Sequence, residues 1–537
     1  MRKITAVLIA ATLFALCFSG CGKPDGESSE APASGSSGDI KHEVNRMSNS
    51  ELEALVKYKT YYKPEIDWLG DPMPYYENGV NYIYYLYDLR KGTIGFHPVD
   101  MVSTTDFGTY KYEGSFLEPS HEVDGRDRGI GTGSIVKKGD TYYMFYTASN
   151  EALVKEGKPR EIIWLAVSKD GMKTWEKDAG FELASTAPYD TDEWRDSYVF
   201  YNPEDKNYTM LISSRIKDGP DKTSGVIVKY SSDDLYNWTH KGIALAPENC
   251  YVTECPQIIQ MGKYWVLVYS EFLLSHFSMN GANSAGPTHY LISESPNGPW
   301  RKAPGGDTFD GRGLNASKIT GGDGNFYIYG WVPQRDECDN EQPWGWGGNG
   351  AAHKLTQADD GTLTVSPPQA VLDGMTKPFP LGFVVGNANE NTDGSKYVFE
   401  SGSVKETIAA QMKVSFKLTF KVKLNGDTSK AGLVFGLKEP KMSRNQKALY
   451  INFDLKNEVM RYDLERDNLT ELAPNCFKSY PFKPGKEYSV TVIAEGSVLC
   501  VYVDGKAAMT TRMYGITDSY MGFFGDGSSF TDVKMER

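Results

Sequence analysis

The sequence predicts an all-β protein, a five-bladed β-propeller followed by a C-terminal β-sandwich. Three observations support this fold class: an aromatic, strand-like run that recurs five times, Asp/Gly turns between the runs, and longer alternating segments from about Leu381 onward. The 537 residues are 40% apolar and 24% charged, with 54 Gly and 27 Pro. That composition supplies several packed cores and excludes a largely disordered chain.

The charge pattern argues against a nucleic-acid partner. The formal net charge of −13 is spread along the chain without a Lys/Arg-rich block, whereas phosphate backbones are bound by clustered basic residues. Aromatic residues make up 13% of the chain, and 34 of them are Tyr. Such residues favour short strands and can stack on sugar rings.

The N-terminus predicts an exported lipoprotein. Arg2 and Lys3 precede an apolar run from Ile4 to Phe18, which is too short to span a bilayer and is typical of a signal peptide. Residues 18–21, Phe-Ser-Gly-Cys, resemble the bacterial lipobox, in which Cys21 becomes the lipidated first residue. Residues 1–21 are therefore expected to be a lipoprotein signal peptide, and the mature protein an extracellular one held by a lipid anchor alone, on the cell membrane or the outer membrane. The alternative is an ordinary signal peptide with a chance Cys.

Residues 22–60 are expected to form a flexible tether and one short helix. Gly22 to Asp39 is rich in Ser, Gly, Pro and Glu, a composition that does not form a packed core. Further on, Ser50 and Glu53 have the spacing of a capping box ahead of apolar residues, which predicts a helix start.

Five aromatic runs mark the propeller that we expect over residues 61–375. They are Tyr82 to Tyr85, Tyr142 to Phe145, Tyr208 to Leu211, Tyr264 to Leu267 and Phe326 to Tyr329. Their starts are separated by 60, 66, 56 and 62 residues, and four of them are followed by a Ser-containing strand end, a turn and an aromatic residue. Short antiparallel strands repeated at this period are typical of propeller blades.

Residues 381–537 are expected to form a β-sandwich, because the repeat stops and longer alternating segments begin. These segments are Val414 to Leu424, Gly432 to Leu437, Tyr488 to Ala494 and Val498 to Val503. Asn425-Gly426 and Asp504-Gly505 are typical of the turns between antiparallel strands. Packing against the propeller is the favoured role for this domain, and glycan binding is the alternative.

No metal or other cofactor is predicted. The five Cys of the mature chain are odd in number and irregularly spaced, and neither they nor the seven His have the spacing of metal ligands. These cysteines are Cys250, Cys255, Cys338, Cys476 and Cys500.

Equivalent positions in the repeats hold the candidate functional residues. Counting back ten to twelve residues from the aromatic runs gives Asp71, Thr132, Asp196, Glu254 and Asn315. We expect these residues to precede the first strand of each blade and to converge at the axial channel. Three of the five are acids, and glycoside cleavage needs one carboxylate near the anomeric carbon and one acid that protonates the leaving oxygen.

Three motifs carry a resemblance to a known family. Trp-x-x-Asp-Pro at 68–72, Arg-Asp at 195–196 and Glu-Cys-Pro at 254–256 resemble, in order and spacing, those of glycoside hydrolase family 32, the invertases, inulinases and levanases. The resemblance covers roughly Asp67 to Arg537, since that family also joins a five-bladed propeller to a β-sandwich.

The resemblance implies a retaining mechanism. Asp71 would be the nucleophile, Glu254 the general acid/base, and Asp196, beside Arg195, the transition-state stabiliser that grips ring hydroxyls. Thr132 lies where the family has a Phe-Ser-Gly-Ser loop and would offer a hydroxyl to the sugar. Retention further implies that the Asp71 and Glu254 carboxyl groups lie about 5 to 5.5 Å apart.

Other residues depart from the family pattern beside the nucleophile. The family's Asn before the nucleophile is Gly70, the Asn-Gly after the Asp-Pro is Met73-Pro74, the Gln that ends the first inner strand is Asp88, and the Trp-Gly of the next strand is His97-Pro98. Several of these positions contact the terminal fructose in the family. Trp68 and Asp88 are retained as expected substrate-binding residues.

Two further features have competing interpretations. Trp331, Trp344 and Trp346 lie with Asp336 and Glu337 in a Gly-rich stretch, where they either stack on sugar, Trp331 foremost, or pack a blade-closing loop. Cys255 adjoins Glu254, but no His is placed to activate it, so it is expected to be a packing residue that keeps Glu254 in an apolar setting.

The leading hypothesis is hydrolysis of terminal β-fructofuranosyl linkages in fructans or sucrose-like sugars, with an oligo- or polysaccharide as partner. The departures near Asp71 leave open a related five-bladed furanosidase that acts on another sugar, such as arabinofuranose. A lipoprotein that binds glycan without cleaving it is the third alternative, although a binding protein needs no acid/base pair.

Overall fold

The computed structural model describes residues 47–88, 97–272, 285–342, 344–382, 385–386, 389–390, 394–426, 430–440, 448–464 and 476–537. Residues 47–537 form one compact unit. The predicted signal peptide, Cys21 and most of the tether lie outside the described residues. Among the helices that are described, none has the length and the apolar character needed to cross a bilayer.

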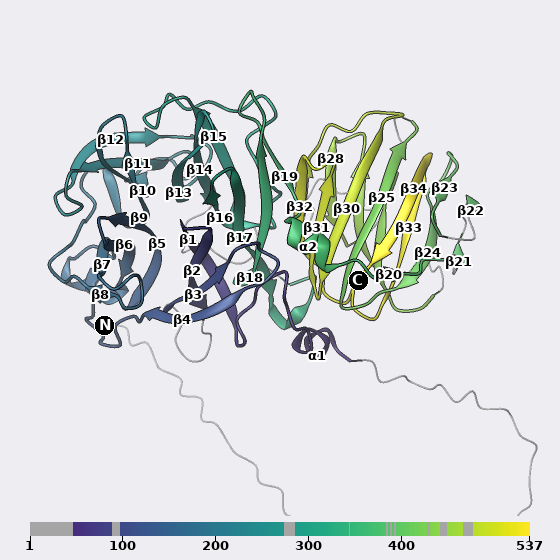
Figure 1. Cartoon of the computed structure of the whole chain (residues 1–537), viewed down its shortest axis with the longest axis horizontal. Coiled ribbons are helices and arrows are strands. Elements are labelled where there is room, and N and C mark those ends of the chain that lie inside the picture. The colour runs from purple at the N-terminus through teal and green to yellow at the C-terminus, as the bar shows by residue number, and fades with distance from the viewer. Residues whose placement is uncertain are drawn as a thin grey trace, which may run out of the picture. The chain divides into compact units, whose positions relative to one another are not determined.

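The predicted fold class is confirmed: antiparallel sheets form five blades, and a β-sandwich follows them (Figure 1). Blade 1 contains β1 (Trp68–Glu77), β2 (Val80–Asp88), β3 (Val99–Thr104) and β4 (Lys111–Leu117). Blade 2 contains β5 (Gly129–Lys138), β6 (Thr141–Ser149), β7 (Glu161–Ser168) and β8 (Glu176–Lys177). Blade 3 contains β9 (Tyr189–Asn202), β10 (Asn207–Ile216), β11 (Gly225–Ser232) and β12 (Thr239–Leu245).

The remaining blades complete the propeller. Blade 4 contains, within the described residues, β13 (Val252–Met261), β14 (Tyr264–Phe272) and β15 (Ala285–Ser293). Blade 5 contains β16 (Asn315–Gly322), β17 (Asn325–Arg335), β18 (Trp344–Gln357) and β19 (Leu363–Ser366). Two 3-10 helices, η1 (Glu151–Glu156) and η3 (Asp336–Cys338), lie in the loops, and α2 (Gln369–Gly374) follows the last blade.

The first strands of the blades form a ring. Each contacts the first strand of the next blade, from β1 through β5, β9, β13 and β16 and back to β1. The ring is closed by pairing of β1 with β18, where Leu69 faces Gly348, which joins blades 1 and 5 into one eight-stranded sheet. A residue at the same place in each first strand is therefore brought to the axis.

The aromatic runs lie on the second strand of each blade, and they are largely buried. Tyr84, Tyr85, Phe145 and Tyr329 have no exposed surface, because they fill the space between neighbouring sheets. The expectation that the candidate residues precede the first strands was wrong, since they lie within those strands. The stretch Gly-Asp-Pro at 70–72 has residue types that are depleted in strands, so the sequence did not indicate a strand there. It is part of β1 because its neighbours pair with β2, which is rich in aromatic residues.

The C-terminal domain consists of two sheets that pack around one large core. One sheet contains β20 (Pro378–Phe379), β22 (Asn389–Glu390), β23 (Tyr397–Phe399), β25 (Ser415–Leu424), β30 (Glu487–Glu495), β31 (Val498–Val503), β32 (Ala507–Arg512) and β34 (Ser528–Glu536). The other contains β21 (Val385–Gly386), β24 (Lys405–Gln411), β26 (Lys430–Leu437), β27 (Leu449–Asp454), β28 (Val459–Asp463), β29 (Cys476–Ser479) and β33 (Tyr520–Asp526).

Only one of the two predicted sandwich turns closes a hairpin. Asp504 and Gly505 both have positive φ, 53° and 60°, and connect the paired strands β31 and β32. Asn425-Gly426 instead follows β25, whose successor β26 belongs to the opposite sheet. The turn sequence specifies a change of direction, whereas the partner of each strand is decided by the packing of the two sheets.

The short helix α1 (Asn49–Ala54) begins two residues earlier than predicted. Its capping box is formed by Ser48 and Glu51, so the predicted pair Ser50 and Glu53 was wrong. Both predicted residues have tertiary partners instead: the Ser50 hydroxyl donates to the Glu337 carbonyl at 3.1 Å, and Glu53 accepts from Ser497 at 3.0 Å.

Arg512, at the end of β32, ties the sandwich to the propeller. Its fully buried guanidinium donates to the carbonyls of Pro333 and Val332 at 2.7 and 3.1 Å and to the Asn349 side chain at 2.5 Å, all in blade 5. It also donates to Ser497 at 2.7 Å and lies 3.4 Å from Glu53, so one side chain joins blade 5, the sandwich and α1.

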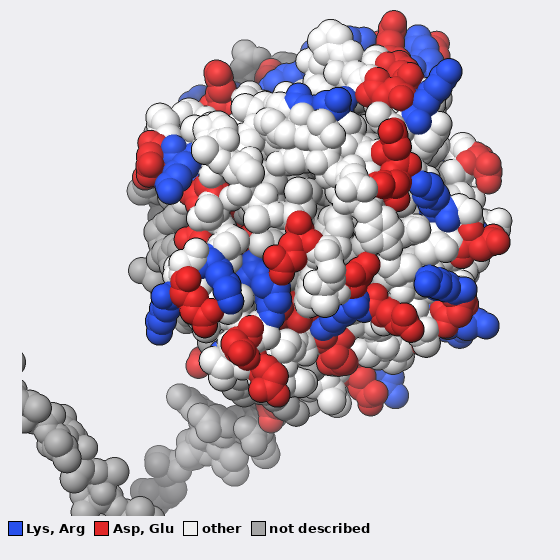
Figure 2. Space-filling model, turned by 90° about the vertical axis from the view of Figure 1, so that its left-hand side faces the viewer, with Lys and Arg blue, Asp and Glu red and all other residues white. Residues whose placement is uncertain are grey.

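The surface of the propeller carries charges of both signs. On the face shown in Figure 2, Lys and Arg are interspersed with Asp and Glu around white, uncharged patches. No continuous basic patch is visible on that face.

Replacing Arg512 by Met is expected to destabilise the protein by about 3 to 5 kcal/mol, because two buried carbonyls and Glu53 lose a charged donor. Denaturant unfolding followed by fluorescence measures this loss. The matched control is Lys421→Met, which removes ion pairs at a side chain that is 44% exposed and should cost under about 1 kcal/mol. Equal midpoints for the two variants would show that the Arg512 contacts do not hold the domains together.

Candidate active site

Each of the five inner strands is irregular at the same place. The pairing of the first strand with the second shifts register between Gly70 and Pro72 in β1 and between Gly131 and Gly133 in β5. The corresponding shifts lie opposite Ile212 for β9, after Glu254 in β13 and after Asn315 in β16. These β-bulges leave Asp71, Thr132 and Asp196 unpaired on the strand and turn their side chains out of the pleat.

In three of the strands the bulge contains a non-glycine residue with positive φ. Asp196, Cys255 and Ala316 have φ values of 57°, 51° and 48°. Such a conformation is costly for these residue types and persists where the surroundings hold it in place. The repeated strain indicates that the bulges serve the arrangement of this channel.

Asp71 is held by residues from two other blades. Its Oδ2 accepts a hydrogen bond from the Thr132 hydroxyl at 2.8 Å, and its Oδ1 accepts one from Trp331 Nε1 at 2.9 Å. Asp71 is half-buried, whereas Thr132 and Trp331 are almost fully buried. Both oxygens therefore have a hydrogen-bond donor that fixes the orientation of the carboxylate, which keeps an exposed edge.

Asp196 lies deeper in the channel, with 3% of its surface exposed. Its Oδ2 accepts the backbone N–H of Cys255 at 2.9 Å, and its own N–H donates to the Thr147 hydroxyl at 2.9 Å. Thr147 donates in turn to the Thr132 carbonyl at 3.0 Å, so one chain of hydrogen bonds links blades 2, 3 and 4. Cys255 contributes its backbone amide, and burial raises the pKa of its thiol, which keeps the sulfur neutral.

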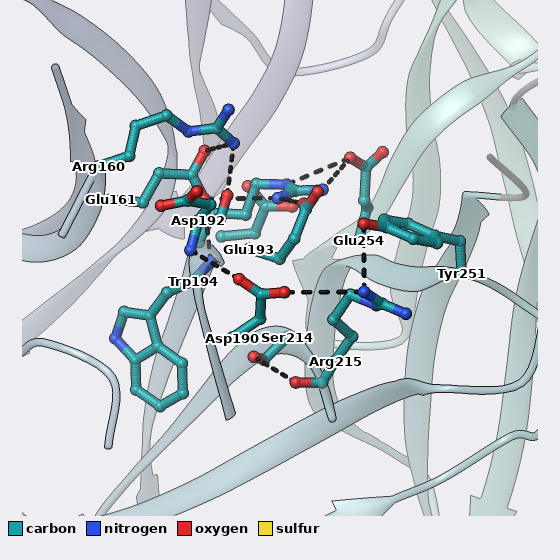
Figure 3. Close-up of polar contacts among 12 residues, drawn as sticks. Arg160, Glu161, Asp190, Asp192, Glu193, Trp194, Ser214, Arg215, Tyr251 and Glu254 are labelled. Atoms are coloured by element: carbon teal, nitrogen blue, oxygen red, sulfur yellow. Dashed lines mark hydrogen bonds and ion pairs between the residues drawn. The ribbon is translucent and has the colours of Figure 1, made fainter. Parts of the chain in front are cut away.

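Glu254 is bound to Arg195 on the neighbouring blade. Its Oε1 accepts from Nε at 3.3 Å and from Nη2 at 3.1 Å, while 22% of its side chain remains exposed. Arg195 also pairs with two other buried carboxylates, Glu193 and Glu161, the latter at 3.4 Å. Glu161, Glu193 and Glu254, which are labelled in Figure 3, are thus all partners of the Arg195 guanidinium group.

Burial is the largest influence on the acidity of Glu254, and it raises the pKa of that carboxyl above the ordinary value. Arg195 opposes this effect, and the carboxylates of Asp196 and Asp71 reinforce it. The pKa of Asp196 is likewise raised by burial and lowered by Arg195. Because two other acids share the charge of Arg195, Glu254 can hold a proton at a pH at which an exposed glutamic acid is ionised.

The structure therefore brings all three predicted acids to one channel, together with Arg195, Thr132 and Trp331. Trp68 and Asp88 face each other across β1 and β2, beside Gly347 of β18. Lys63 lies over the Trp68 ring at 4.6 Å. Two more tryptophans were candidates for sugar stacking. Trp344 packs against the sandwich core and has Arg335 over its ring, which fits the packing interpretation. Trp346 lies against Trp331.

Several residues at the site were missed by the sequence analysis. Glu193, Glu161 and Thr147 bind the backbone or side chains of the 195–196 pair, and Lys318, fully buried in β16, donates to the Gly133 carbonyl at 3.0 Å. Glu193 lies two residues before Arg195, on the same face of the strand, so the sequence could have suggested it as a partner of Arg195. The other three come from distant strands and carry no motif. Among the described residues, no group of three or more His, Cys, Asp or Glu is arranged to hold a metal ion.

Comparisons with known protein families match both domains. The family model described as Glycosyl hydrolases family 32 N-terminal domain matches residues 61–367, and the one described as Glycosyl hydrolases family 32 C terminal matches residues 385–536. These ranges correspond to the propeller and the sandwich.

Individual proteins are similar at lower identity. A levanbiose-producing levanase of Bacillus subtilis is 26% identical over 372 residues, which are 63% of this chain and 65% of that protein. A levanbiose-producing levanase of Geobacillus stearothermophilus is 27% identical over 342 residues, 57% of this chain and 78% of that protein. The structure of an exo-inulinase from Aspergillus awamori has a TM-score of 0.66 at 15% identity, covers 90% of this chain and 98% of that chain, and shows the shared fold.

Glu193→Gln is expected to lower the pKa of Glu254, because Arg195 then pairs more fully with the remaining carboxylates. The measurement is a 13C NMR titration of the glutamate carboxyls, with the Glu254 signal assigned from its loss in Glu254→Gln. Glu176→Gln, at an exposed position on β8, is the control and should leave the titration unchanged. An unchanged or higher pKa of Glu254 in Glu193→Gln would contradict the shared-counterion arrangement.

Proposed function

The chain belongs to glycoside hydrolase family 32, and from this premise we propose that it hydrolyses β-fructofuranosyl linkages of fructans or sucrose-like sugars with retention of configuration. The observation that carries the proposal is the convergence of Asp71, Asp196 and Glu254 at the propeller axis, where Asp71 accepts hydrogen bonds from two neutral donors and burial raises the pKa of Glu254. Retaining glycosidases need an ionised nucleophile beside a protonated acid.

Asp71 is proposed as the nucleophile. The donors Thr132 and Trp331 orient the carboxylate, so an oxygen lone pair can be directed at the anomeric carbon. The attack forms a covalent fructosyl–Asp71 ester as the bond to the leaving oxygen breaks. Water then cleaves the ester and restores the carboxylate.

Glu254 is proposed as the acid/base residue. In the first step it gives its proton to the departing oxygen, and in the second it takes a proton from the attacking water. Its raised pKa suits the first role, and its exposed edge leaves room for the leaving group. The contact with Arg195 stabilises the carboxylate that forms between the two steps.

Asp196 and Arg195 are proposed to stabilise the transition state beside the reacting centre. Asp196 has one oxygen bound to the Cys255 amide, which orients the carboxylate toward the channel. The Arg195 guanidinium contacts the carboxylates of Glu161, Glu193 and Glu254. We propose that its role is electrostatic: it holds Glu254 in place and partly neutralises the negative charge of these three acids.

Fructans are the favoured substrates, because the similar proteins are named levanases and an exo-inulinase. The competing sugar is arabinofuranose, and the observation that favours it is the set of departures at Gly70, Asp88 and Pro98 from the family pattern around the nucleophile. A glycan-binding protein without activity is less favoured, since binding alone does not require Asp71 and Glu254 in contrasting environments.

We further propose that the mature protein begins at a lipidated Cys21 and acts outside the bacterial cell. The support is the apolar run ending in Phe-Ser-Gly-Cys at 18–21 and the tether-like composition that follows. A tether of this kind would hold the propeller close to the membrane while polysaccharide reaches it from outside.

The purified chain is expected to release reducing sugar from levan, inulin or sucrose and not from an α-arabinofuranoside. The assay is a product analysis by chromatography, combined with NMR of the first product formed to establish the anomeric configuration. Hydrolysis of the arabinofuranoside alone would replace the fructosidase proposal with its competitor. Binding without release from any substrate would support the non-catalytic alternative.

The same assay on site variants assigns the activity to these residues. Asp71→Asn and Glu254→Gln should each lower kcat by about 10³-fold or more, with Glu254→Gln less impaired on an aryl furanoside whose leaving group needs no proton. Glu176→Gln serves as the control for folding and assay.

Cys21→Ser is expected to abolish incorporation of labelled palmitate and to move the protein from the detergent phase to the aqueous phase in Triton X-114 partition of expressing bacterial cells. The physical reason is that a single apolar run of this length leaves no anchor once the signal peptide is removed. Unchanged partition of the variant would refute lipidation at this residue.

A further inference from the structure

Trp346 occupies the space beside Gly70, the residue that precedes the proposed nucleophile. A Cβ atom built on Gly70 would lie 2.7 Å from Cζ3 of the Trp346 ring and closer still to Cη2 and Cζ2. The benzo ring of Trp346 therefore rests directly on the backbone of Gly70. A side chain at residue 70 and the present position of Trp346 exclude each other.

Two further aromatic rings surround Trp346. The imidazole of His97 lies against it, with ring centroids 4.5 Å apart and planes 32° from parallel. The Trp331 ring, whose Nε1 donates to Asp71, is 5.8 Å away on another side. One ring, that of Trp331, thus links Trp346 to the Asp71 carboxylate, and His97 lies against Trp346; we call Trp346 and His97 the aromatic wall.

The aromatic wall is uncharged and partly open. Burial lowers the pKa of His97, although Asp88 and Asp71 act in the opposite direction, so its imidazole is neutral at neutral pH. Both Trp346 and His97 are half-buried and keep some exposed surface. The next residue after Trp346, Gly347, has a positive φ of 79°, a conformation that glycine adopts easily. A side chain at Gly347 would meet Asp88 and Trp68, so glycine at this position also leaves room for those residues.

These contacts connect sequence features that are far apart in the chain. Gly70, Asp88 and His97 are three of the positions at which the sequence differs from the family pattern around the nucleophile, and all three lie next to Trp346 or Gly347. These three differences therefore lie in one local region. Where the family pattern has an Asn side chain at the position of Gly70, this protein has the ring of Trp346 from β18.

We propose that Trp346 is a specificity-determining residue that binds the furanose attacked by Asp71 by stacking against the C–H face of its ring. The inference rests on the proposed function, since it takes Asp71 as the reacting group. A flat apolar surface beside a carboxylate suits a sugar, which presents C–H groups on one face and hydroxyls at its edge. Affinity on this side of the subsite then comes from ring contact in place of an amide hydrogen bond.

Trp346→Ala is expected to raise KM about tenfold with a smaller change in kcat, because stacking acts on the bound sugar before and during reaction. Trp346→Phe should recover much of the loss. The matched control is Trp344→Phe, two residues away on the same strand but packed against the sandwich, which should leave KM unchanged. Melting temperatures of all variants separate a binding effect from a folding effect.

Gly70→Ala provides a second, independent variant. Gly70 does not have a positive φ, so its backbone accepts Ala, and the three atoms nearest to the added Cβ all belong to the Trp346 ring. The single variant should displace Trp346 and raise KM as Trp346→Ala does, whereas in the Trp346→Ala background Gly70→Ala should have no added effect. Such non-additivity is the signature of the two groups competing for one space.

The outcomes distinguish this inference from the proposed function. An unchanged KM in Trp346→Ala, or additive effects of the two substitutions, would overturn the role of Trp346 while leaving the fructosidase proposal intact. A wild-type chain that cleaves an arabinofuranoside alone would overturn the fructosidase proposal. The same KM comparison on that substrate would then decide the role of Trp346.

Discussion

The site depends on a β-bulge that recurs at one place in every inner strand of the propeller. A regular strand would direct alternate side chains into the spaces between blades, where the aromatic runs already fill the volume. The register shift after Gly70 and its equivalents in the next two blades release Asp71, Thr132 and Asp196 from the pleat and turn them into the channel, whereas Glu254 stays paired with Ser270 and directly precedes the shift in β13. Positive φ at Asp196 and Cys255 is the strain that accompanies this change of direction.

The acids of the channel lie close together, so their negative charges repel one another unless a cation lies among them. Arg195 is the shared counterion of Glu254, Glu193 and Glu161, and no single carboxylate receives its full charge. Asp71, by contrast, is held by the neutral donors Thr132 and Trp331. The two proposed catalytic carboxylates thus differ in environment: Asp71 is held by two neutral donors, and Glu254 is buried so that its pKa is raised, which suits the acid in glycoside cleavage.

Much of this arrangement could be predicted from the order of residues, although with errors of placement. Counting back from the aromatic runs selected Asp71, Asp196 and Glu254, yet those runs form the second strand of each blade, and the acids lie within the first. The capping box was assigned to Ser50 and Glu53, whereas Ser48 and Glu51 form it, because Glu53 contacts Ser497 and Arg512. A motif gives spacing, but it does not tell which neighbours compete for a side chain.

The sequence by itself determined the repeat, the change of domain near residue 381 and the three acids, because each depends on local pattern or on equivalent places in successive repeats. The tertiary structure decided which other groups surround those acids. Glu161 and Thr147 belong to no motif of their own, and Trp346 was one of three tryptophans with two competing interpretations, so their neighbours in space were needed to assign them. Gly70 shows the difference most clearly: in the sequence it is a missing side chain, and in the folded protein its place is taken by the ring of Trp346.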